Sequence, residues 1–344
     1  MSIFASKSFL CKLAMAVLCL PGIVSCSSQQ VWKKLNGSVW NTSYSIEYRC
    51  ERLLDDSIIA EMRRVELILS PFDPESEISR VNRGERDILS PEAARVFEAS
   101  QRVNRLSGGL FDPTVAPLVN LWGFGYKREH KSPGDSYEAP SQAAIDSALA
   151  LVGISRCALT PDGHLIKAHP ATEFDFSAIA KGYGVDRVAE VLKRCGSEDF
   201  LVEIGGECRA GGLNKEEEPW LVRIDSPGAG NSVPGSGPSA GTAVLRDKAI
   251  ATSGNYRNYH DLTDGRRVGH TISPLTGQPI QSEILSATVI ADDCMTADAL
   301  ATACMAMTLD QARAMLTPIH NVAALLIVAR DGKPTCIFIN KWPQ

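Results

Sequence analysis

Residues 175–204, DFSAIAKGYGVDRVAEVLKRCGSEDFLVEI, set a helix directly in front of a strand, and this mixture decides the fold class. Residues 182–192 are predicted to be helical, and the apolar run 200–204 is predicted to be a strand. Elsewhere, helices and strands mix without a regular βαβ repeat, so we expect an α+β fold with a largely antiparallel sheet. The chain shows no internal repeat and no clear linker. We therefore expect one unit of two intimately packed α/β lobes.

Apolar spacing and capping residues predict further helices on both sides of this stretch. Ser90-Pro91-Glu92 opens one helix with an N-cap residue and a proline at its first position, and Gly108-Gly109 closes it. Thr308 and Gln311 form a capping box for another. That second helix is predicted at 309–316. Further helices are predicted at 141–151 and 295–305, and in a segment with four apolar residues on one face: Ile58, Met62, Val65 and Leu69.

Strand and turn patterns complete the prediction. Two hairpins are expected, one over residues 158–167 around Asp162-Gly163 and one that joins 323–328 to 335–339 across Asp331-Gly332. Residues 226–241 are almost all Gly, Pro, Ser and Ala, which predicts a solvated loop. Single strands are predicted at 38–48, 220–224, 242–245 and 287–290.

The composition is that of an ordinary globular protein. The chain has 344 residues, of which 44% are hydrophobic and 22% charged, and this excludes disordered, collagen-like and coiled-coil proteins. Lys and Arg number 35 against 40 Asp and Glu, which gives a formal net charge of −5. Since no Lys/Arg-rich run stands out from this balance, we do not expect a nucleic-acid partner.

The first residues have the pattern of a bacterial export signal. Lys7 and Lys12 precede an apolar run over 13–20, which is too short to span a bilayer. Ile23-Val24-Ser25-Cys26 then has the order of a lipobox. We expect a signal peptide at 1–25, a lipidated Cys26 and one domain at 26–344, anchored to a membrane of the cell envelope and facing outside the cytoplasm, in the periplasm. The alternative is a plain cleaved signal.

Cysteine usage points to no metal or redox motif. Of the ten cysteines, Cys11, Cys19 and Cys26 belong to the leader, and the other seven include no CxxC pair. Most are therefore predicted to be small buried hydrophobes. The chain also lacks a phosphate loop ending in GK[ST], an HExxH and a GxSxG motif, and Gly205-Gly206 lacks the third glycine of a dinucleotide fingerprint.

Three polar constellations remain as candidate sites. Asp298 and Thr302 stand at i and i+4, so on a helix their oxygens share one face and can serve Mg²⁺, which prefers a few protein oxygens and substrate phosphates. Residues 175–184 form a polar turn into a helix, with Lys181 near any bound anion. His270 precedes a Pro-Gly turn and can accept a proton. Taken alone, each is more often structural: a helix-surface pair, a close-packed turn and a turn histidine.

Six sequence strings, taken together and in order, resemble the ApbE family, the FAD:protein FMN transferases. The likeness extends over about residues 38–340. Any one of these strings alone is a weak match, but six in order after a lipobox are a specific one. The strings are LSPFDPESEISRVN (69–82), LFDPTVAPLVNLWGFG (110–125), DFSAIAKGYGVD (175–186), IATSGNYRNY (250–259), GHTISPLTG (269–277) and MTADALATA (295–303).

This resemblance implies a reaction and a place for its substrate. The reaction is Mg²⁺-dependent cleavage of the FAD diphosphate, with FMN passed to a Thr or Ser hydroxyl of an exported or membrane flavoprotein and AMP released. The acceptors implied are subunits of membrane redox complexes. The fold implied is α+β, with an FAD cleft between its two lobes. Such chemistry requires a deprotonated alcohol and a stabilised charge on the leaving phosphate.

Carried over position by position, the resemblance also implies the site residues. Asp298, Thr302 and the backbone carbonyl of Ala178 match the metal ligands, and His270 matches the base. Residues matching flavin-nucleotide contacts are Asp175, Lys181 and Ile272. Residues matching the lining of the FAD cleft are Trp40, Phe72, Thr114 and Val115.

The chain departs from the family pattern at three positions. Ser273 replaces an Asp, Leu275 replaces an Arg, and Asn41 stands where a glycine is expected before Thr42. These changes leave His270 and the metal pair intact. Two other functions stay open: a Mg²⁺-dependent FAD pyrophosphatase, in which water replaces the protein hydroxyl, and a non-catalytic FAD-binding lipoprotein.

Overall fold

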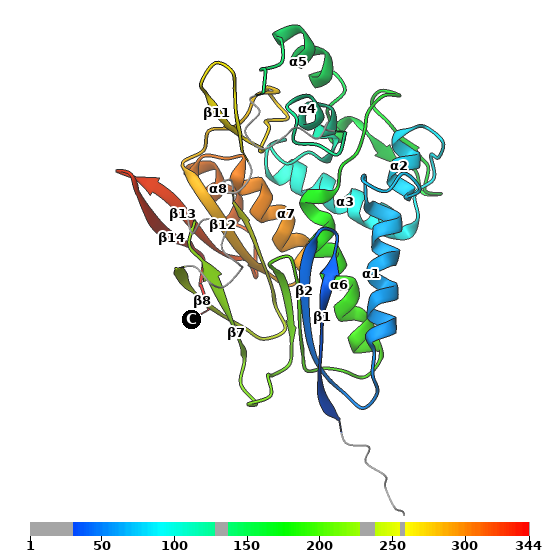
Figure 1. The fold of residues 1–344 in the computed structure, drawn as a ribbon, viewed down its shortest axis with the longest axis vertical. Helices are drawn as coiled ribbons and strands as arrows, with labels where there is room; N and C mark the ends of the chain where they lie inside the picture. The colour runs from blue at the N-terminus through cyan, green and yellow to red at the C-terminus, as the bar shows by residue number, and fades with distance from the viewer. Residues whose placement is uncertain (1–29, 128–136, 228–237, 255–258, 344) are drawn as a thin grey trace, which may run out of the picture.

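One large antiparallel sheet organises the fold. The computed structural model describes residues 30–127, 137–227, 238–254 and 259–343. Eight strands run in the order β1-β2-β5-β6-β9-β12-β13-β14, and every neighbouring pair is antiparallel (Figure 1). The α+β class with a largely antiparallel sheet is thereby confirmed. The strands are β1 (Val31–Val39), β2 (Thr42–Cys50), β5 (Phe200–Ile204), β6 (Glu207–Gly211), β9 (Ala249–Gly254), β12 (Ile284–Ala291), β13 (Ala323–Arg330) and β14 (Lys333–Ile339).

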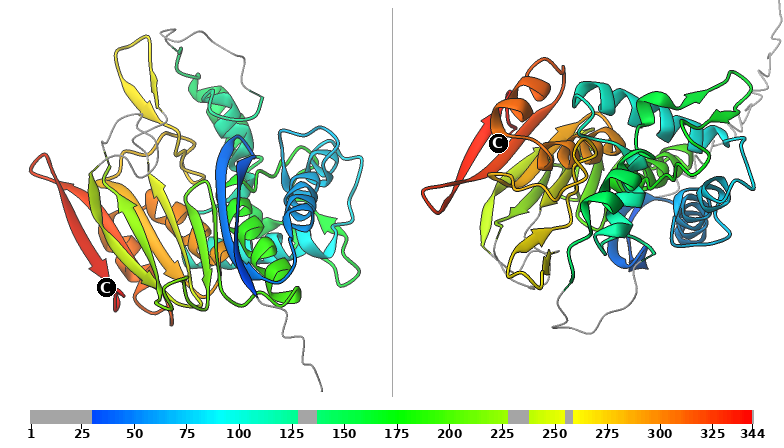
Figure 2. Two further views of the ribbon diagram at one scale, coloured as in Figure 1. Left: turned by 60° about the horizontal axis from the view of Figure 1, so that its bottom comes forward. Right: turned by 90° about the horizontal axis from the view of Figure 1, so that it is seen from above.

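The central strands bury both faces of this sheet. On β9 and β12, Ala251 and Val289 belong to one apolar cluster, whereas Ile250 and Ile290 belong to another. Helices cover the first face, as Figure 2 shows, and the hairpin of β7 (Trp220–Asp225) and β8 (Ser239–Leu245) packs on the second. The main helices are α1 (Asp55–Leu69), α3 (Pro91–Leu106), α6 (Ser177–Arg194), α7 (Cys294–Met305) and α8 (Leu309–Leu316).

A smaller lobe lies beyond one end of the sheet, at the top of Figure 1. Its apolar cluster includes Leu118, Trp122 and Ile145, and Trp122 donates a hydrogen bond from its ring nitrogen to the Gly277 carbonyl at 2.8 Å. Its elements are α4 (Ala116–Leu121), α5 (Gln142–Leu149), β10 (Tyr259–Asp261) and β11 (Arg267–Gly269), while α2 (Glu77–Asn82), β3 (Ala158–Leu159), β4 (Leu165–Ile166) and the 3₁₀ turns η1 (Pro113–Val115) and η2 (Ile154–Arg156) lie nearby in the chain.

The predicted single strand at 38–48 is wrong, because a tight turn divides it. Trp40 and Asn41 have φ of 51° and 58°, and β1 and β2 pair on either side of them. Two consecutive residues in the left-handed region form the kind of turn that suits a twisted hairpin. Asn tolerates this conformation, but Trp rarely signals it, so the sequence pattern did not reveal the turn. Strands β6 and β9 and helix α2 were also not predicted.

Helix α6 begins at Ser177, ahead of the predicted start at residue 182. The sequence did not indicate this earlier start, because Gly182 and Gly184 are poor helix formers. They are required by close packing: a Cβ on Gly182 would lie 2.3 Å from the Cys294 carbonyl oxygen, and a Cβ on Gly184 would lie 2.1 Å from the Trp40 ring. Ala178 and Lys181 therefore occupy the first turns of a helix rather than a loop.

Most other predicted elements agree closely with the structure. Ser90 caps α3 by accepting a hydrogen bond from the Ala93 N–H, and the capping box of α8 is present. Asp331 and Gly332, at φ 49° and 72°, form the turn between β13 and β14. Four predicted core residues of α1 are all buried: Ile58, Met62, Val65 and Leu69.

Several predictions fall on residues that the structure does not describe. The signal peptide and Cys26 lie within residues 1–29, outside the described ranges, as does 228–237 of the predicted loop. The loop prediction is wrong at 239–241, where β8 already begins. Among the described residues, no helix combines the length and apolar content that crossing a membrane requires.

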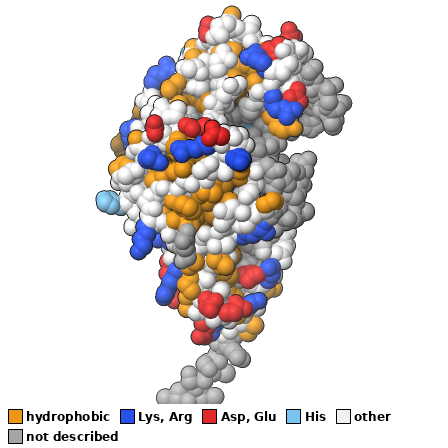
Figure 3. Space-filling view, turned by 90° about the vertical axis from the view of Figure 1, so that its left-hand side faces the viewer, with side chains coloured by type: hydrophobic (Ala, Val, Ile, Leu, Met, Phe, Trp, Pro, Cys, Tyr) orange, Lys and Arg blue, Asp and Glu red, His pale blue; other side chains and the backbone are white. Residues whose placement is uncertain are grey.

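The side of the molecule on which β13 and β14 lie carries an apolar area between charged side chains (Figure 3). Exposed apolar residues on β7 and β14 include Leu221 and Phe338. The cavities described next are lined by other elements, at the opposite edge of the sheet and beneath the smaller lobe.

Candidate functional site

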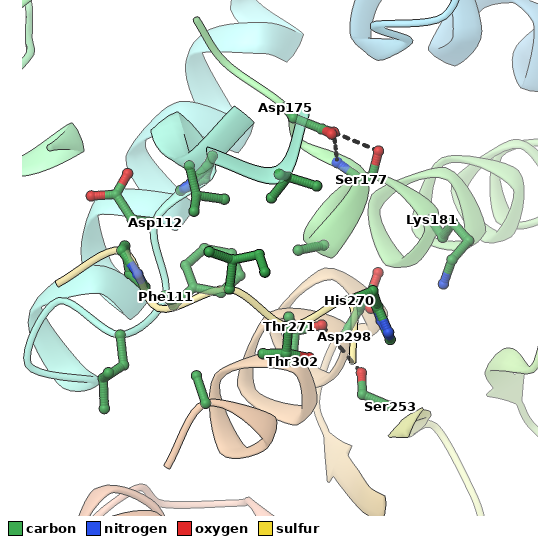
Figure 4. Close-up of a pocket in the computed structure, with 18 of the residues that line it drawn as sticks. Phe111, Asp112, Asp175, Ser177, Lys181, Ser253, His270, Thr271, Asp298 and Thr302 are labelled. Atoms are coloured by element: carbon green, nitrogen blue, oxygen red, sulfur yellow. Dashed lines mark hydrogen bonds between the residues drawn. The ribbon is translucent and has the colours of Figure 1, made fainter. Parts of the chain in front are cut away.

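A cavity of about 370 Å³ brings five of the six sequence strings together. Helices α6 and α7 form its floor, and the segments around Phe111 and His270 close it (Figure 4). Eight of the residues singled out from the sequence line this cavity: Val115, Asp175, Ala178, Lys181, His270, Ile272, Asp298 and Thr302.

Helix α7 presents Asp298 and Thr302 on the same face. Asp298 is 2% exposed, and its Oδ2 accepts a hydrogen bond from the Gly182 N–H at 2.9 Å. The Thr302 hydroxyl shares a hydrogen bond with the Ser253 hydroxyl at 3.1 Å (Figure 4). Burial raises the pKa of Asp298, and the nearby Lys181 opposes that rise. The carboxylate and the hydroxyl therefore reach the cavity one helical turn apart, as the spacing predicted.

Helix α6 supplies the main-chain part of the site. In a regular helix the Gly182 N–H bonds the carbonyl of Ala178, four residues earlier. Here that N–H donates to Asp298, which lies on the neighbouring helix. Ala178 lines the same cavity, one turn of α6 before this contact between the two helices.

Asp186 fixes the start of α7 from within α6. Its carboxylate accepts hydrogen bonds from the N–H groups of Cys294 and Met295, both at 2.9 Å, and pairs with Arg209. These N–H groups have no partner within α7 itself. Burial raises the pKa of Asp186 to about 6, while Arg209 lowers it. The contact sets the position of the helix that carries Asp298.

Lys181 is the positive charge of the cavity. Its ammonium group pairs with Glu207, the first residue of β6, which is 3% exposed. Burial alone would lower the pKa of Lys181, but Asp298 and Glu207 outweigh it and raise the pKa, so the ammonium stays charged. Burial raises the pKa of Glu207, and Lys181 opposes this rise.

The donors available for a metal ion are oxygens. Within the described ranges, no group of three or more His, Cys, Asp or Glu side chains could hold a metal ion. The cavity offers instead one carboxylate on Asp298, one hydroxyl on Thr302 and the main chain of Ala178. This sparse set fits Mg²⁺, because Mg²⁺ prefers oxygen ligands and completes its shell with water and substrate phosphates.

His270 and Asp175 approach the cavity from different sides. His270 follows β11, and its ring makes an edge-to-face contact with Phe124, with 6.4 Å between ring centroids. Both His270 and Asp175 line the cavity (Figure 4). Asp175 accepts hydrogen bonds from the Ser177 N–H and hydroxyl at 2.9 and 2.5 Å, and burial raises its pKa.

The two aromatic residues line a neighbouring cavity of about 420 Å³. Trp40 and Phe72 line it together with Ser177 and Lys181, which also line the first cavity. In the described part of the chain, the buried ring nitrogen of Trp40 has no hydrogen-bond partner. The two cavities therefore meet at the start of α6, and an aromatic wall lies next to the charged one.

Thr114 lines neither of these two cavities. Its side chain is fully buried, its hydroxyl donates to the Asp112 carboxylate at 2.6 Å, and it accepts a hydrogen bond from the Gly153 N–H at 2.7 Å. The residue thus fixes the loop that holds Val115 at the cavity.

Several polar residues of the cavity were not singled out from the sequence, among them Ser253 and Glu207. Ser253 lies within one of the quoted strings, at the end of β9. Glu207 follows Gly205-Gly206, which were considered only as a nucleotide fingerprint. A two-glycine turn after a predicted strand is also a hairpin signal. Interpreted as a hairpin, the two glycines would have predicted that Glu207 points back toward α6.

Comparison with known proteins identifies relatives over most of the chain. The model of the ApbE family matches residues 40–326. A protein of Haemophilus influenzae named FAD:protein FMN transferase is 35% identical over 339 residues, which are 92% of this chain and 92% of that protein. One of Vibrio cholerae with the same name is 36% identical over 319 residues, covering 90% and 91%. The solved structure described as flavin transferase ApbE from Vibrio cholerae has a TM-score of 0.77 and 33% identity, covering 90% of this chain and 98% of that one. The chain belongs to the ApbE family.

Proposed function

We propose that this protein is a Mg²⁺-dependent FAD:protein FMN transferase. FAD is the donor, the hydroxyl of a Thr or Ser in an exported or membrane flavoprotein is the acceptor, and AMP leaves. The names of the relatives support the donor and the transferred group. The oxygen donors of the charged cavity support the metal.

One observation carries the proposal: the buried carboxylate of Asp298 and the hydroxyl of Thr302 share a cavity with a charged lysine and a histidine. A diphosphate requires positive charge around it, and a hydroxyl nucleophile requires a base. Lys181 offers the charge, and His270 offers the base. The neighbouring cavity lined by Trp40 and Phe72 gives flat aromatic faces to a ring of the flavin nucleotide.

The chain's own residues have distinct tasks in this reaction. Mg²⁺, when bound, polarises the phosphate that is attacked. Asp298, Thr302 and the carbonyl of Ala178 hold it. His270 takes the proton of the acceptor hydroxyl as its oxygen attacks the phosphorus of the FMN half. Lys181 faces the negative charge of the departing AMP phosphate.

We also propose that Cys26 is lipidated and that the protein works at a membrane of the cell envelope, outside the cytoplasm. The lipobox supports this. In the sequence, Cys26 lies only a few residues before Val31, where β1 begins. The Trp40–Asn41 turn at the other end of β1 borders the second cavity. Acyl chains on Cys26 would therefore tether the end of the β1–β2 hairpin that lies away from the cavity.

The test is direct. The purified protein, FAD, Mg²⁺ and a flavoprotein subunit of a membrane redox complex are incubated, and the acceptor is analysed by mass spectrometry. We expect a threonine or serine that gains the mass of one FMN less one water, together with one AMP, and no adduct with the His270→Ala variant. Free FMN without an adduct would indicate a pyrophosphatase instead, and intact FAD a binding protein.

A further inference from the structure

A glycine hairpin directs one carboxylate toward the cation site. Gly205 and Gly206, at φ 66° and 101°, form the turn between β5 and β6, and Ile204 pairs with Glu207 across it. The Glu203 carboxylate accepts a hydrogen bond from the Gly206 N–H at 2.8 Å, which holds the turn in place. As a result Glu207 points from the first residue of β6 toward α6.

The two oxygens of Glu207 have different surroundings. Oε1 pairs with the Lys181 ammonium, whereas Oε2 is buried and, within the described residues, has no hydrogen-bond partner. The residue is only 3% exposed. Native proteins rarely keep a buried carboxylate with an unpartnered oxygen, since removing such a charge from water is expensive. The presence of this buried carboxylate beside the charged cavity therefore requires a functional explanation.

The charges around Lys181 supply that explanation. Asp298 and Glu207 are two carboxylates against one ammonium group, and all three line the same cavity. In the described part of the chain, the ion pair of Lys181 is made with Glu207, while Asp298 bonds the Gly182 N–H. The other two carboxylates of the cavity, Asp112 and Asp175, are bonded to Thr114 and Ser177. In the described part of the chain, Asp298 is therefore the carboxylate near Lys181 that no ion pair balances.

We propose that Glu207 is a positioning residue for the cation: it binds the ammonium of Lys181 and thereby leaves the charge of Asp298 to Mg²⁺. This inference rests on the proposed function, because it assumes that Asp298 holds the metal. Without Glu207, the ammonium would balance Asp298 and repel a divalent ion. Residues that tune the surroundings of a metal ion without touching it typically change metal affinity about 10- to 100-fold when replaced.

The experiment measures Mn²⁺ affinity by electron paramagnetic resonance of the full chain without FAD. Because burial raises the pKa of Glu207, the titration is run at about pH 8. We expect Glu207→Gln, which keeps the shape of the side chain, to weaken Mn²⁺ binding at least about tenfold. The double variant Lys181→Met, Glu207→Gln restores the charge balance, so its affinity should return to about that of the unmodified protein.

Glu198→Gln is the matched control, because it removes an exposed carboxylate just before the same hairpin and outside the cavity. We expect it to bind Mn²⁺ as the unmodified protein does. Unchanged affinity in Glu207→Gln, or a loss that persists in the double variant, would overturn the proposal. So would an unmodified protein that binds no Mn²⁺.

FMN transfer is measured on the same samples. If the unmodified protein transfers no FMN while the Mn²⁺ affinities follow the expected order, the proposed function fails and the role of Glu207 stands. If transfer occurs but the affinities do not follow that order, the role of Glu207 fails alone.

Discussion

At the scale of single residues, the site depends on charges that are held by specific hydrogen bonds. Asp298 is buried against the Gly182 N–H, and Lys181 is paired with Glu207. A buried charge with a fixed partner keeps its orientation when substrate arrives, so little reorganisation is needed during reaction. Removing a charge from this set should therefore affect metal binding more than folding.

Asp298→Asn is expected to reduce Mg²⁺-dependent FMN transfer at least about 100-fold, because the amide keeps the shape but supplies no negative charge to a hard cation. FAD binding, followed by quenching of flavin fluorescence, should persist in the absence of metal. Asp310→Asn, an exposed acid at the start of α8, is the control and should retain normal transfer. Normal transfer by Asp298→Asn at saturating Mg²⁺ would contradict the assignment.

Thr114→Val tests a residue that the family pattern assigns to the FAD cleft. Valine keeps the volume but leaves the Gly153 N–H without its partner and removes one hydrogen bond to the Asp112 carboxylate, which should cost about 1–3 kcal/mol in the free energy of unfolding. FAD affinity should not change. Urea denaturation and a flavin titration measure the two quantities. Thr317→Val, whose hydroxyl is exposed, should change stability by no more than about 0.5 kcal/mol. Lower FAD affinity at unchanged stability would place Thr114 in the cleft.

At the scale of elements, the contact between α6 and α7 determines the geometry of the proposed metal ligands. Helix α6 contributes Ala178 and Lys181, and α7 contributes Asp298 and Thr302. The helices approach closely at Gly182, and Asp186 fixes the first turn of α7. Both contacts lie within the string 175–186, which explains why one sequence motif bears on binding and on helix packing.

Gly182→Ala should separate these helices. Its Cβ would lie 2.3 Å from the main-chain oxygen of Cys294, and backbone cannot rotate away as a side chain can. We expect a loss of about 1–3 kcal/mol in stability together with weaker Mn²⁺ binding. Gly269→Ala, whose Cβ meets open space, is the control for stability. Wild-type stability and metal affinity in Gly182→Ala would show that the close approach is unimportant.

Asp186 makes the stability of this helix pair depend on pH. Its pKa rises from 3.8 to about 6 because of burial, so the folded protein binds the proton more tightly than the unfolded chain does. Ionisation therefore destabilises the fold as pH rises from about 4 to 7, by up to about 3 kcal/mol relative to a side chain that cannot ionise.

The stability of Asp186→Asn relative to the unmodified protein should thus improve by that amount over the same interval, whatever the difference between the two proteins at low pH. Urea unfolding at several pH values gives the difference. A difference that is independent of pH would mean that Asp186 ionises normally in the folded protein.

At the scale of the whole molecule, local signals predicted helices and hairpins better than the connections of the sheet. The apolar face of α1 and the caps of α3 and α8 depend on neighbouring residues, so the sequence shows them. The order of the eight strands depends on contacts between distant segments, and no local pattern carries it. The Trp40–Asn41 turn was missed for the same reason: the packing of Trp40 against Gly184 compensates an unfavourable turn residue.

The candidate site shows the same division. The spacing of Asp298 and Thr302 was visible in the sequence, whereas the pairing of Lys181 with Glu207 joins a helix to a strand and was not. The departure at Ser273 is accommodated locally, because its hydroxyl accepts hydrogen bonds from the N–H groups of Leu275 and Thr276 at 3.3 and 3.2 Å. The turn next to His270 therefore keeps its bonds with a serine in place of the acid.

The most direct test of this account is a crystal structure of the protein with FAD and Mn²⁺, in which anomalous scattering locates the ion. We expect one anomalous peak within about 2.5 Å of an oxygen of Asp298 and of the Thr302 hydroxyl, with the diphosphate of FAD as a further ligand. A diphosphate bound without an ion at these two side chains, or an ion held elsewhere, would contradict it.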